Sequence, residues 1–352
     1  MNTGFLKKLS RQRSAVFGVV IILITSIAAV FAYFIAPDHS PFANRIIPEI
    51  ANQKPGFSIS FLQIKKIGAV EKPGILNRLV NGLPDSCDFI PIMSSAENKD
   101  SIIAQKYIDE NLTERIAIPK AKLTTTPVIK KTFLLGTDKF GRDILSRLII
   151  GSRVSLSVGL ITVLISLGIG IFLGLIAGYY GGKTDKVIMW FVNVIWSIPT
   201  LLFVFALTLI LGKGFWQVFV AVGLTMWVNV ARLVRGQALE ARELEYVEAA
   251  RALGFSNTRI IFRHILPNIL GPVMVIAAAN FAAAILIEAG LSFLGIGVQP
   301  PQPSWGLMIR ENYNFIITGN PMAALEPGIA IMFLVLAFNL LGNGLRDAMQ
   351  VK

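Results

Sequence analysis

The sequence predicts an all-α polytopic membrane protein with six transmembrane helices, and with a small extracytoplasmic α+β insertion between the first two. Composition and the length of the apolar runs carry this prediction. Apolar residues make up 54% of the 352 residues, charged residues only 15%, and the mean hydropathy is +0.64. Globular chains are about 25% charged. A spanning helix needs about 20 mostly apolar residues, and the chain contains several uncharged runs of that length.

The first predicted span covers residues 15–36, which carry no charged side chain. Its N-terminal flank is basic and contains Lys7, Lys8, Arg11 and Arg13. A cleaved signal peptide is the alternative, but its apolar core is normally about 7–15 residues long. Because this run is longer, we expect residues 1–36 to form a cytoplasmic N-terminus and a retained first helix.

Residues 37–135 are polar, mixed in charge and interrupted by prolines. The stretch FSISF, Phe57–Phe61, alternates apolar and polar side chains, which is typical of a strand. The stretch SIIAQKYIDENL, residues 101–112, favours a helix. We therefore expect a small extramembrane α+β insertion.

Residues 136–352 contain the other five predicted spans. They are the uncharged or nearly uncharged runs 154–182, 187–212, 214–231, 265–287 and 327–345. Pro199 interrupts the third of the six spans, and we expect a kink there because proline lacks an amide donor and clashes with the preceding turn. The Pro/Gly-rich loop LGIGVQPPQPSWG precedes the last span, where irregular backbone must lie outside the hydrocarbon or in a protein-lined cavity.

Basic residues orient the spans, because cytoplasmic loops carry an excess of lysine and arginine. With the N-terminus inside, the following residues are also inside: Lys183, Lys186, Arg232, Arg235, Arg242, Arg251, Arg259, Arg263, Arg346 and Lys352. A smaller group falls outside: Lys213, Arg310, Arg142, Arg147 and Arg153. The bias is incomplete but favours both termini in the cytoplasm, which places the insertion on the opposite side.

Small residues recur every four positions along the second span, at Ser166, Gly170, Gly174 and Gly178. They share one helix face, where another helix can approach closely. That helix belongs either to this chain or to a partner subunit, and the sequence favours neither.

Several function classes are unlikely on composition. Cys87 is the single cysteine, and His39 and His264 are the two histidines, so the chain lacks the clusters that bind metals. The net charge of +12 comes with no motif for DNA or RNA. The basic residues instead lie mostly beside apolar spans, where they contact anionic lipid headgroups.

The stretch AGYYGGKT, residues 177–184, matches a loose phosphate-loop pattern. A working phosphate loop joins a buried strand to the N-terminus of a helix. Here a transmembrane run precedes the glycines and another follows them, so we expect Gly182, Lys183 and Thr184 to form a turn between spans. The chain itself is not expected to bind or hydrolyse ATP.

The loop between the fourth and fifth spans, within about residues 235–268, has the most informative pattern. Leu244, Val247, Ala250 and Leu253 or Gly254 recur at helical spacing. Gly254 is placed to end a helix in the left-handed conformation. Ser256 is placed to cap a second helix, which leads through Pro267 into the fifth span. An interfacial helix lying on the membrane is the alternative to a docking elbow.

This loop resembles the EAA loop of bacterial ABC-importer permeases, since Glu248-Ala249-Ala250 is followed at the family's spacing by Gly254 and by HILP. His264 stands where many such families carry isoleucine, and the form RHILPN resembles the peptide-importer branch. The motifs LGTDKFGRDILSRLIIGSRVSL, GYYGGKTD, SIPTLL, EAGLSFLGIGVQPPQPSWG and GNGLRDAM resemble the C-type permease of dipeptide, oligopeptide and nickel importers. The resemblance covers residues 135–352 but not most of residues 37–135.

The resemblance implies a bacterial inner-membrane, multi-pass permease that pairs with a second, B-type permease, two cytoplasmic ATPases and an extracytoplasmic substrate-binding protein. ATP and Mg²⁺ would be bound by the ATPases, and this chain would hold no cofactor. The implied ATPase-coupling residues are Glu248, Ala249, Ala250, Arg251, Gly254, Phe255, Ser256 and Pro267.

Two polar residues are candidates for the translocation path. Glu288 lies near the outer end of the fifth span, where ionisable groups are costly and often functional. The alternative for Glu288 is an interfacial group that is hydrated or paired with Arg310. Asn280 belongs to a set of amides within or beside the spans, together with Asn193, Asn229 and Asn339, for which bonding between helices is the commoner role.

Asp138, Arg142 and Asp143 precede the second span. They either contact the binding protein or form a helix cap with a local ion pair, and the cap is slightly favoured.

An ion-coupled secondary transporter and an intramembrane enzyme are the alternative function classes. An ion-coupled secondary transporter usually needs carboxylates or broken helices at the membrane midplane, and these spans are nearly free of charge. An intramembrane enzyme needs a catalytic constellation, and the sequence shows no HExxH motif, no paired intramembrane aspartates and no Ser-His-Asp set.

Overall fold

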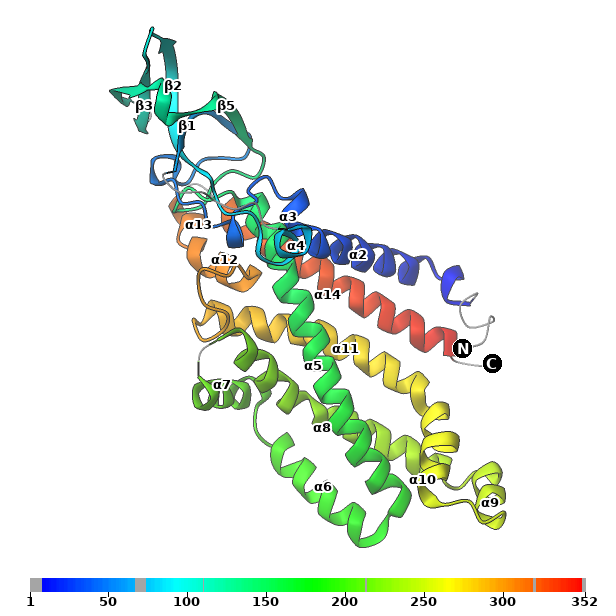
Figure 1. The fold of residues 1–352 in the computed structure, drawn as a ribbon. Coiled ribbons are helices and arrows are strands. Elements are labelled where there is room, and N and C mark those ends of the chain that lie inside the picture. The colour runs from blue at the N-terminus through cyan, green and yellow to red at the C-terminus, as the bar shows by residue number, and fades with distance from the viewer. Residues whose placement is uncertain (1–7, 67–73, 110, 213, 319–320, 350–352) are drawn as a thin grey trace. The chain divides into compact units, whose positions relative to one another are not determined.

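A computed structural model describes residues 8–66, 74–109, 111–212, 214–318 and 321–349 (Figure 1). The chain divides into two compact units. Unit 1 contains residues 1–25, 155–299 and 330–352, and unit 2 contains residues 26–154 and 300–329. Lys7 and Lys352, which belong to the predicted basic flanks, lie outside the described residues.

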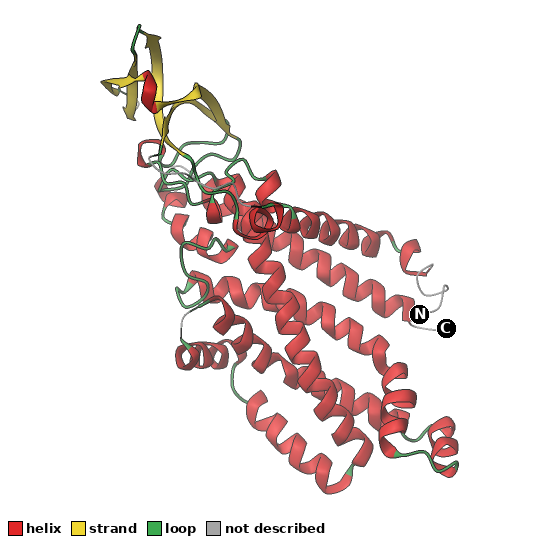
Figure 2. Ribbon diagram, in the orientation of Figure 1, coloured by secondary structure: helices red, strands yellow, loops and turns green. Residues whose placement is uncertain are grey.

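Helices dominate the described chain (Figure 2). Five helical runs are long and apolar enough to cross a membrane, and a bent pair adds a sixth if it counts as one span. The five runs are α2 (Arg13–Val30), α5 (Ile144–Tyr180), α8 (Phe215–Ala241), residues 257–293 and α14 (Met322–Met349). Residues 257–293 comprise α10 (Asn257–Ile260), a π turn at Ile261–Ile265 and α11 (Leu266–Phe293). A mostly helical, polytopic chain is therefore confirmed.

The bent pair consists of α6 (Gly182–Trp196) and α7 (Thr200–Leu211), whose axes differ by 89°. Pro199 precedes the first residue of α7 and adopts an extended ψ of 123°. Since proline has no N–H to donate and disfavours the helical conformation in the residue before it, the helix stops there. The predicted kink is thus a complete break.

Within unit 1, the small-residue face of α5 packs against α8 (Figure 1). A Cβ added to Gly170, Gly174 or Gly178 would lie 2.5–2.8 Å from side-chain carbons of Val230, Val234 and Ala238, respectively. Only glycine allows this approach. The helix that meets the small-residue face therefore belongs to the same chain.

The ends of several unit 1 helices meet at one end of the unit. Gly344 of α14 lies against Ala15 of α2, and Gly271 at the start of α11 lies against Met349 at the end of α14. The start of α2, the end of α14 and the start of α11 consequently lie on the same side. This is the arrangement that an even number of crossings requires.

Unit 2 contains an antiparallel sheet of five described strands in the order β4-β3-β2-β1-β5. The strands are β1 (Phe57–Lys65), β2 (Cys87–Glu97), β3 (Ser101–Asp109), β4 (Leu112–Pro119) and β5 (Leu123–Phe133). Short helices α3 (Ala32–Ile35) and α4 (Ile75–Asn81) accompany the sheet.

The strand predicted at Phe57–Phe61 is confirmed as part of β1, but the helix predicted over residues 101–112 is wrong. Residues 101–109 form β3 and Leu112 begins β4, and β3 pairs with strands on both sides. Ile102 and Ala104 are buried while the residues between and beside them are more exposed, which is the period of two that a strand shows. Backbone pairing and this alternation outweigh a weak helical preference.

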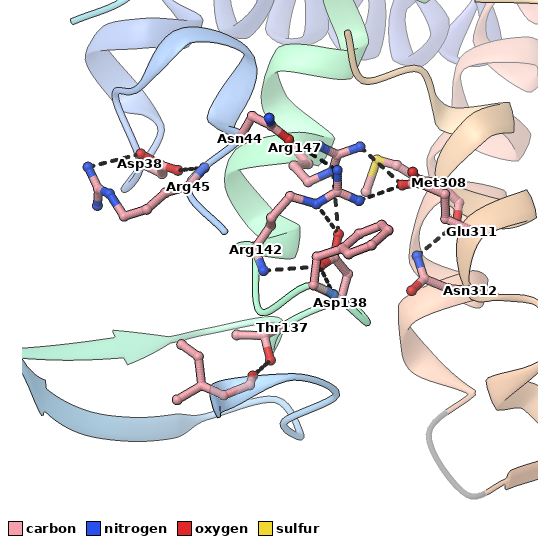
Figure 3. Close-up of polar contacts among 12 residues, drawn as sticks. Asp38, Asn44, Arg45, Thr137, Asp138, Arg142, Arg147, Met308, Glu311 and Asn312 are labelled. Atoms are coloured by element: carbon pink, nitrogen blue, oxygen red, sulfur yellow. Dashed lines mark hydrogen bonds and ion pairs between the residues drawn. The ribbon is translucent and has the colours of Figure 1, made fainter. Parts of the chain in front are cut away.

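A buried ion network ties α12 (Trp305–Asn312) to the start of α5 within unit 2 (Figure 3). Arg142 donates through Nε to Asp138 at 2.7 Å and through Nη2 to Glu311 at 2.6 Å. Arg147 donates to the same Glu311 oxygen at 3.3 Å. The side chains of Arg142, Arg147 and Asp138 are at most 3% exposed, and that of Glu311 is 10% exposed. We call these four residues the unit 2 ion network.

The cap and ion pair predicted before α5 are confirmed. The Asp143 carboxylate accepts a hydrogen bond from the backbone N–H of Ser146 at 2.9 Å, as a helix cap does. Arg142 and Asp138 form the ion pair, although it is buried and shared with a distant helix. Helix α13 (Phe315–Thr318) and three short 3-10 helices, at Pro41–Ala43, Pro48–Ile50 and Lys120–Lys122, also belong to unit 2.

Candidate functional site

The loop after α8 folds into a short helix, α9 (Glu245–Ala252), a turn, and then α10. Glu245 and Glu248 lie in the first turn of α9 and Arg251 lies in the last. This charge order complements the helix dipole, because anions are stabilised at the N-terminus and cations at the C-terminus. The predicted elbow of two helices is present, and its second helix continues into the long run that ends at Phe293.

Gly254 ends α9 in the left-handed conformation, with φ of +77°, as predicted. Its N–H donates to the Arg251 carbonyl at 3.0 Å, and the next N–H, of Phe255, donates to Ala250 at 3.1 Å. These two bonds form a Schellman motif, which satisfies carbonyls that the helix end would leave unpaired. An added Cβ would meet no atom within 4 Å, so the backbone conformation itself is what requires glycine here.

Ser256 occupies the predicted N-cap position, but its side chain makes no capping hydrogen bond. The predicted side-chain cap is therefore wrong. The next residue provides the anchor instead, because Asn257 Oδ1 accepts a hydrogen bond from the Tyr179 hydroxyl of α5 at 2.8 Å. Sequence reasoning missed this pair, which lies 78 residues apart along the chain.

The two faces of α9 differ in exposure. Val247 and Ala250 are buried in a core that also contains Val234 of α8 and Ile265 of the π turn. The other residues of α9, including Glu248, Ala249 and Arg251, are exposed, and so is Gly254. Leu244 and Leu253, which the helical spacing placed on the apolar side, are 46% and 73% exposed. The loop therefore presents a mixed polar and apolar surface from a firmly packed base.

Phe255 stabilises the turn that follows. Its ring stacks on His264 with centroids 5.8 Å apart, and the Arg259 guanidinium lies 4.0 Å from the same ring centroid. Pro267 lies in the first turn of α11, as expected, where its missing N–H costs little. The π turn before it accommodates an extra residue in the helix.

The stretch AGYYGGKT forms the turn between α5 and α6. The 37-residue helix α5 precedes it, where a phosphate loop has a strand. Gly181 and Gly182 adopt positive φ of 64° and 55°, and Lys183 and Thr184 fall in the first turn of α6. Two arginines at the end of α8 secure this turn. Arg235 of α8 binds Asp185 through two nitrogens at 2.5 and 2.7 Å, and Arg242, the residue after α8, donates to the Gly178 carbonyl at 3.3 Å.

The two candidate path residues are both buried within unit 1. Asn280 is 5% exposed and donates to Ser166 at 3.5 Å. Glu288 is fully buried, not hydrated at the surface, and accepts a hydrogen bond from Ser292 at 2.6 Å. Their part in translocation stays a prediction.

A partly polar cavity lies at the break between α6 and α7. A cavity of about 140 Å³ is lined there by Pro199 and Thr200, by Thr225 and Asn229 of α8, and by apolar neighbours. The Arg232 guanidinium of α8 lies 4.2 Å from the ring centroid of Trp196, which also lines the cavity. Pro199 and Asn229 stand out in the sequence, but the sequence does not predict that α8 packs beside the break between α6 and α7.

The chain matches known families along most of its length. Residues 170–351, just over half of the chain, match the family described as binding-protein-dependent transport system inner membrane component. Residues 3–55 match the N-terminal TM domain of oligopeptide transport permease C. Strands β1 to β5 all fall outside both matches.

Individual relatives agree with the family. The dipeptide transport system permease protein DppC of Alkalihalophilus pseudofirmus is 39% identical over 264 residues, 75% of this chain and 80% of that protein. The glutathione transport system permease protein GsiD of Pectobacterium atrosepticum is 44% identical over 218 residues, 62% and 72% of the two chains. The oligopeptide transport system permease protein OppC of Bacillus subtilis is 39% identical over 222 residues, 63% and 72%. The chain therefore belongs to the binding-protein-dependent transport system inner membrane component family, the permeases of ABC importers.

Proposed function

We propose that this chain is one of two permease subunits of an ATP-driven importer for peptides or a related small solute. It would pair with a B-type permease, two cytoplasmic ATPases and an extracytoplasmic substrate-binding protein, in a bacterial inner membrane with both termini inside. The names of its relatives, which include dipeptide, oligopeptide and glutathione permeases, support this substrate class.

The surface of α9 and the following turn carries the proposal. A docking surface must be exposed on one side and rigidly attached on the other, since a flexible loop would absorb the partner's motion. The outer side presents Glu248, Ala249 and Arg251, and the inner side is fixed by Val247 and by the Tyr179–Asn257 hydrogen bond. We assign the coupling role to Glu248–Ser256 and to Pro267, which leads into the next span.

In this scheme the chain performs no covalent chemistry. ATP and Mg²⁺ bind the partner ATPases, and the two states of those subunits contact the α9 surface differently. A ligand shifts a conformational equilibrium only by its differential affinity for the two states, so α9 is where ATP binding would be felt. The shared core of α5, α8, α9 and α11 would then move with α9.

The polar cavity at the α6–α7 break is the proposed part of the path for peptide amides. Thr200, Thr225 and Asn229 supply neutral donors and acceptors, which suit peptides of varied side chains. A polar surface at membrane depth is tolerated where it lines a cavity. Asn280 and Glu288 are further path candidates, which would have to leave their present hydrogen bonds to contact a solute.

Cross-linking of a single cysteine in this chain to lysines of the ATPase, with a reagent that reacts with one thiol and one amine, tests the coupling role. Cys87 is the single native cysteine, so Ala249→Cys in a Cys87→Ala background gives one reactive site on the exposed face of α9. We expect this site to cross-link to the ATPase, with a yield that changes when ATP is trapped. Thr125→Cys, on an exposed position of β5 in the insertion, is the matched control and should give no such product.

Two outcomes would overturn the proposal. Absence of any ATPase cross-link from several exposed α9 positions would remove the coupling surface. Solute uptake by the purified chain alone, driven by an ion gradient without ATP, would favour an ion-coupled secondary transporter instead.

A further inference from the structure

A cavity of about 150 Å³ lies inside unit 2, between the sheet and the segments that flank it. Its walls combine aromatic rings with charged groups of both signs: Phe61, Phe89, Lys131, Asp38, Arg45 and Asp143. Three of these come from β1, β2 and β5, which lie wholly outside the family matches. The proposed transport mechanism makes no use of this cavity.

Most of the charged groups in the cavity wall already have partners. Asp38 accepts from the backbone N–H of Ser40 at 3.0 Å and pairs with Arg45 at 3.3 Å (Figure 3). Arg45 also donates through Nε to Asp85 at 2.8 Å. These ion pairs leave little net charge for a ligand to neutralise on that side of the cavity.

Lys131 differs, because its ammonium makes no ion pair with any carboxylate of the described residues. Its Nζ lies 4.7 Å from the centroid of the Phe89 ring. The Arg45 guanidinium lies 4.0 Å from the same centroid. Burial, and then repulsion by Arg45, lowers the pKa of Lys131. A half-buried cation without an anion is unfavourable, so an incoming carboxylate would gain an attractive and poorly hydrated partner.

Asp143 offers the complementary charge. Its hydrogen-bond donors come from the backbone and hydroxyl of Ser146, in the first turn of its own helix. Burial raises the pKa of Asp143, and the hydrogen bonds from Ser146 and the charge of Lys131 offset that increase only in part. An ammonium group entering the cavity would add a second cation close to this carboxylate.

We propose that this cavity binds a small zwitterionic amino acid, with Lys131 holding its carboxylate and Asp143 receiving its ammonium group. The size agrees, because a cavity of roughly 150 Å³ holds a molecule of about six non-hydrogen atoms, such as benzene, and alanine is of that size. Phe61 and Phe89 would cover the methyl group. This site belongs to unit 2, whereas the α9 surface belongs to unit 1, and it does not depend on the proposed transport function.

Binding of L-alanine to the full-length protein in lipid nanodiscs tests the proposal, with saturation-transfer NMR as the readout. Acetate and methylamine each carry one of the two charges and serve as partial probes. We expect alanine to bind more tightly than acetate, and acetate more tightly than methylamine. Lack of alanine binding to the wild-type protein at millimolar concentration would overturn the proposal, whatever the variants do.

Lys131→Met should weaken alanine binding by about tenfold or more, the effect of losing a charged hydrogen bond. Lys130→Met is the matched control, because it removes the same charge from the adjacent, exposed position on the opposite face of β5. Asp143→Asn keeps a capping side chain and should reduce alanine affinity to that of acetate. Alanine binding to a folded Lys131→Met protein as tight as to wild type would refute the site, and thermal unfolding of each variant establishes that it is folded.

Discussion

The unit 2 ion network and the α9 surface are both rich in charge, but they use it in opposite ways. In the network, two arginines and two carboxylates are sealed from water and bound to one another. On α9 and α10, Glu248, Arg251 and Arg259 are exposed, and the buried apolar residues of the same loop hold the fold. Buried charge therefore fixes the shape of unit 2, whereas exposed charge in unit 1 forms the surface that we propose for the ATPase.

The contrast predicts that the largest loss of stability follows a change within the network. Glu311→Gln leaves Arg142 and Arg147 sharing the single carboxylate of Asp138. Breaking a buried ion group by removing one partner costs about 3–5 kcal/mol of unfolding free energy. Thermal unfolding in detergent measures this, and expression is expected to fall as well.

Glu97→Gln is the control for that variant. Glu97 pairs with Lys120 on the exposed surface of the sheet, where ion pairs contribute little, so the melting temperature should not change. Equal effects of the two substitutions would break the distinction between sealed and exposed charge.

A smaller effect on stability but a large effect on function is expected at Gly254. A β-branched residue at position 254 would have to adopt the φ of +77° that Gly254 has. Backbone strain in this left-handed region costs roughly 1–3 kcal/mol. Gly254→Val should therefore distort the turn, so that transport and solute-stimulated ATPase activity of the assembled transporter fall together while membrane insertion is retained.

Gly254→Asn refines that test, because asparagine tolerates the left-handed conformation better than valine. It should retain more activity than Gly254→Val. Gly168→Ala, at a helical glycine with open space around it, is the control and should be near normal. A fully active Gly254→Val transporter would separate this turn from coupling.

The smallest effect is expected at the hydrogen bond between α5 and the loop. Tyr179→Phe removes the hydroxyl that binds Asn257 and should cost about 0.5–1.5 kcal/mol. We expect weaker protection of the loop amides in hydrogen exchange, with a modest loss of coupled ATPase activity. Tyr180→Phe, at the exposed neighbouring position, should change neither, and an equal response at both tyrosines would contradict the anchor.

The sequence predicted the local features whose causes are themselves local. The lengths of the apolar runs predicted the membrane spans, Pro199 predicted a kink, and Gly254 predicted the end of α9. Each of these features depends on hydropathy or backbone geometry at its own position. The stretch at residues 101–112 was mispredicted because its strand pairing comes from β2 and β4, and pairing energy is not visible in a single segment.

Contacts across long separations were also beyond the sequence. Arg142 and Glu311 are 169 residues apart, and nothing in either neighbourhood identifies the other. For the same reason, the sequence does not show whether the helix that packs against Gly170 and Gly174 belongs to this chain or to another. Only the fold topology shows which polar residues stabilise the interior and which are exposed on a surface.

The glycine contacts between α5 and α8 have a consequence for how the protein is made. Gly170 and Val230, which lie in contact, are separated by the whole of α6 and α7, so α5 leaves the ribosome long before α8 exists. During that interval the small-residue face of α5 lacks its partner helix from this chain. Biosynthesis therefore includes a stage in which α5 has been made but has not yet packed against α8, and chains arrested before Val230 should be the most susceptible to membrane quality-control proteases.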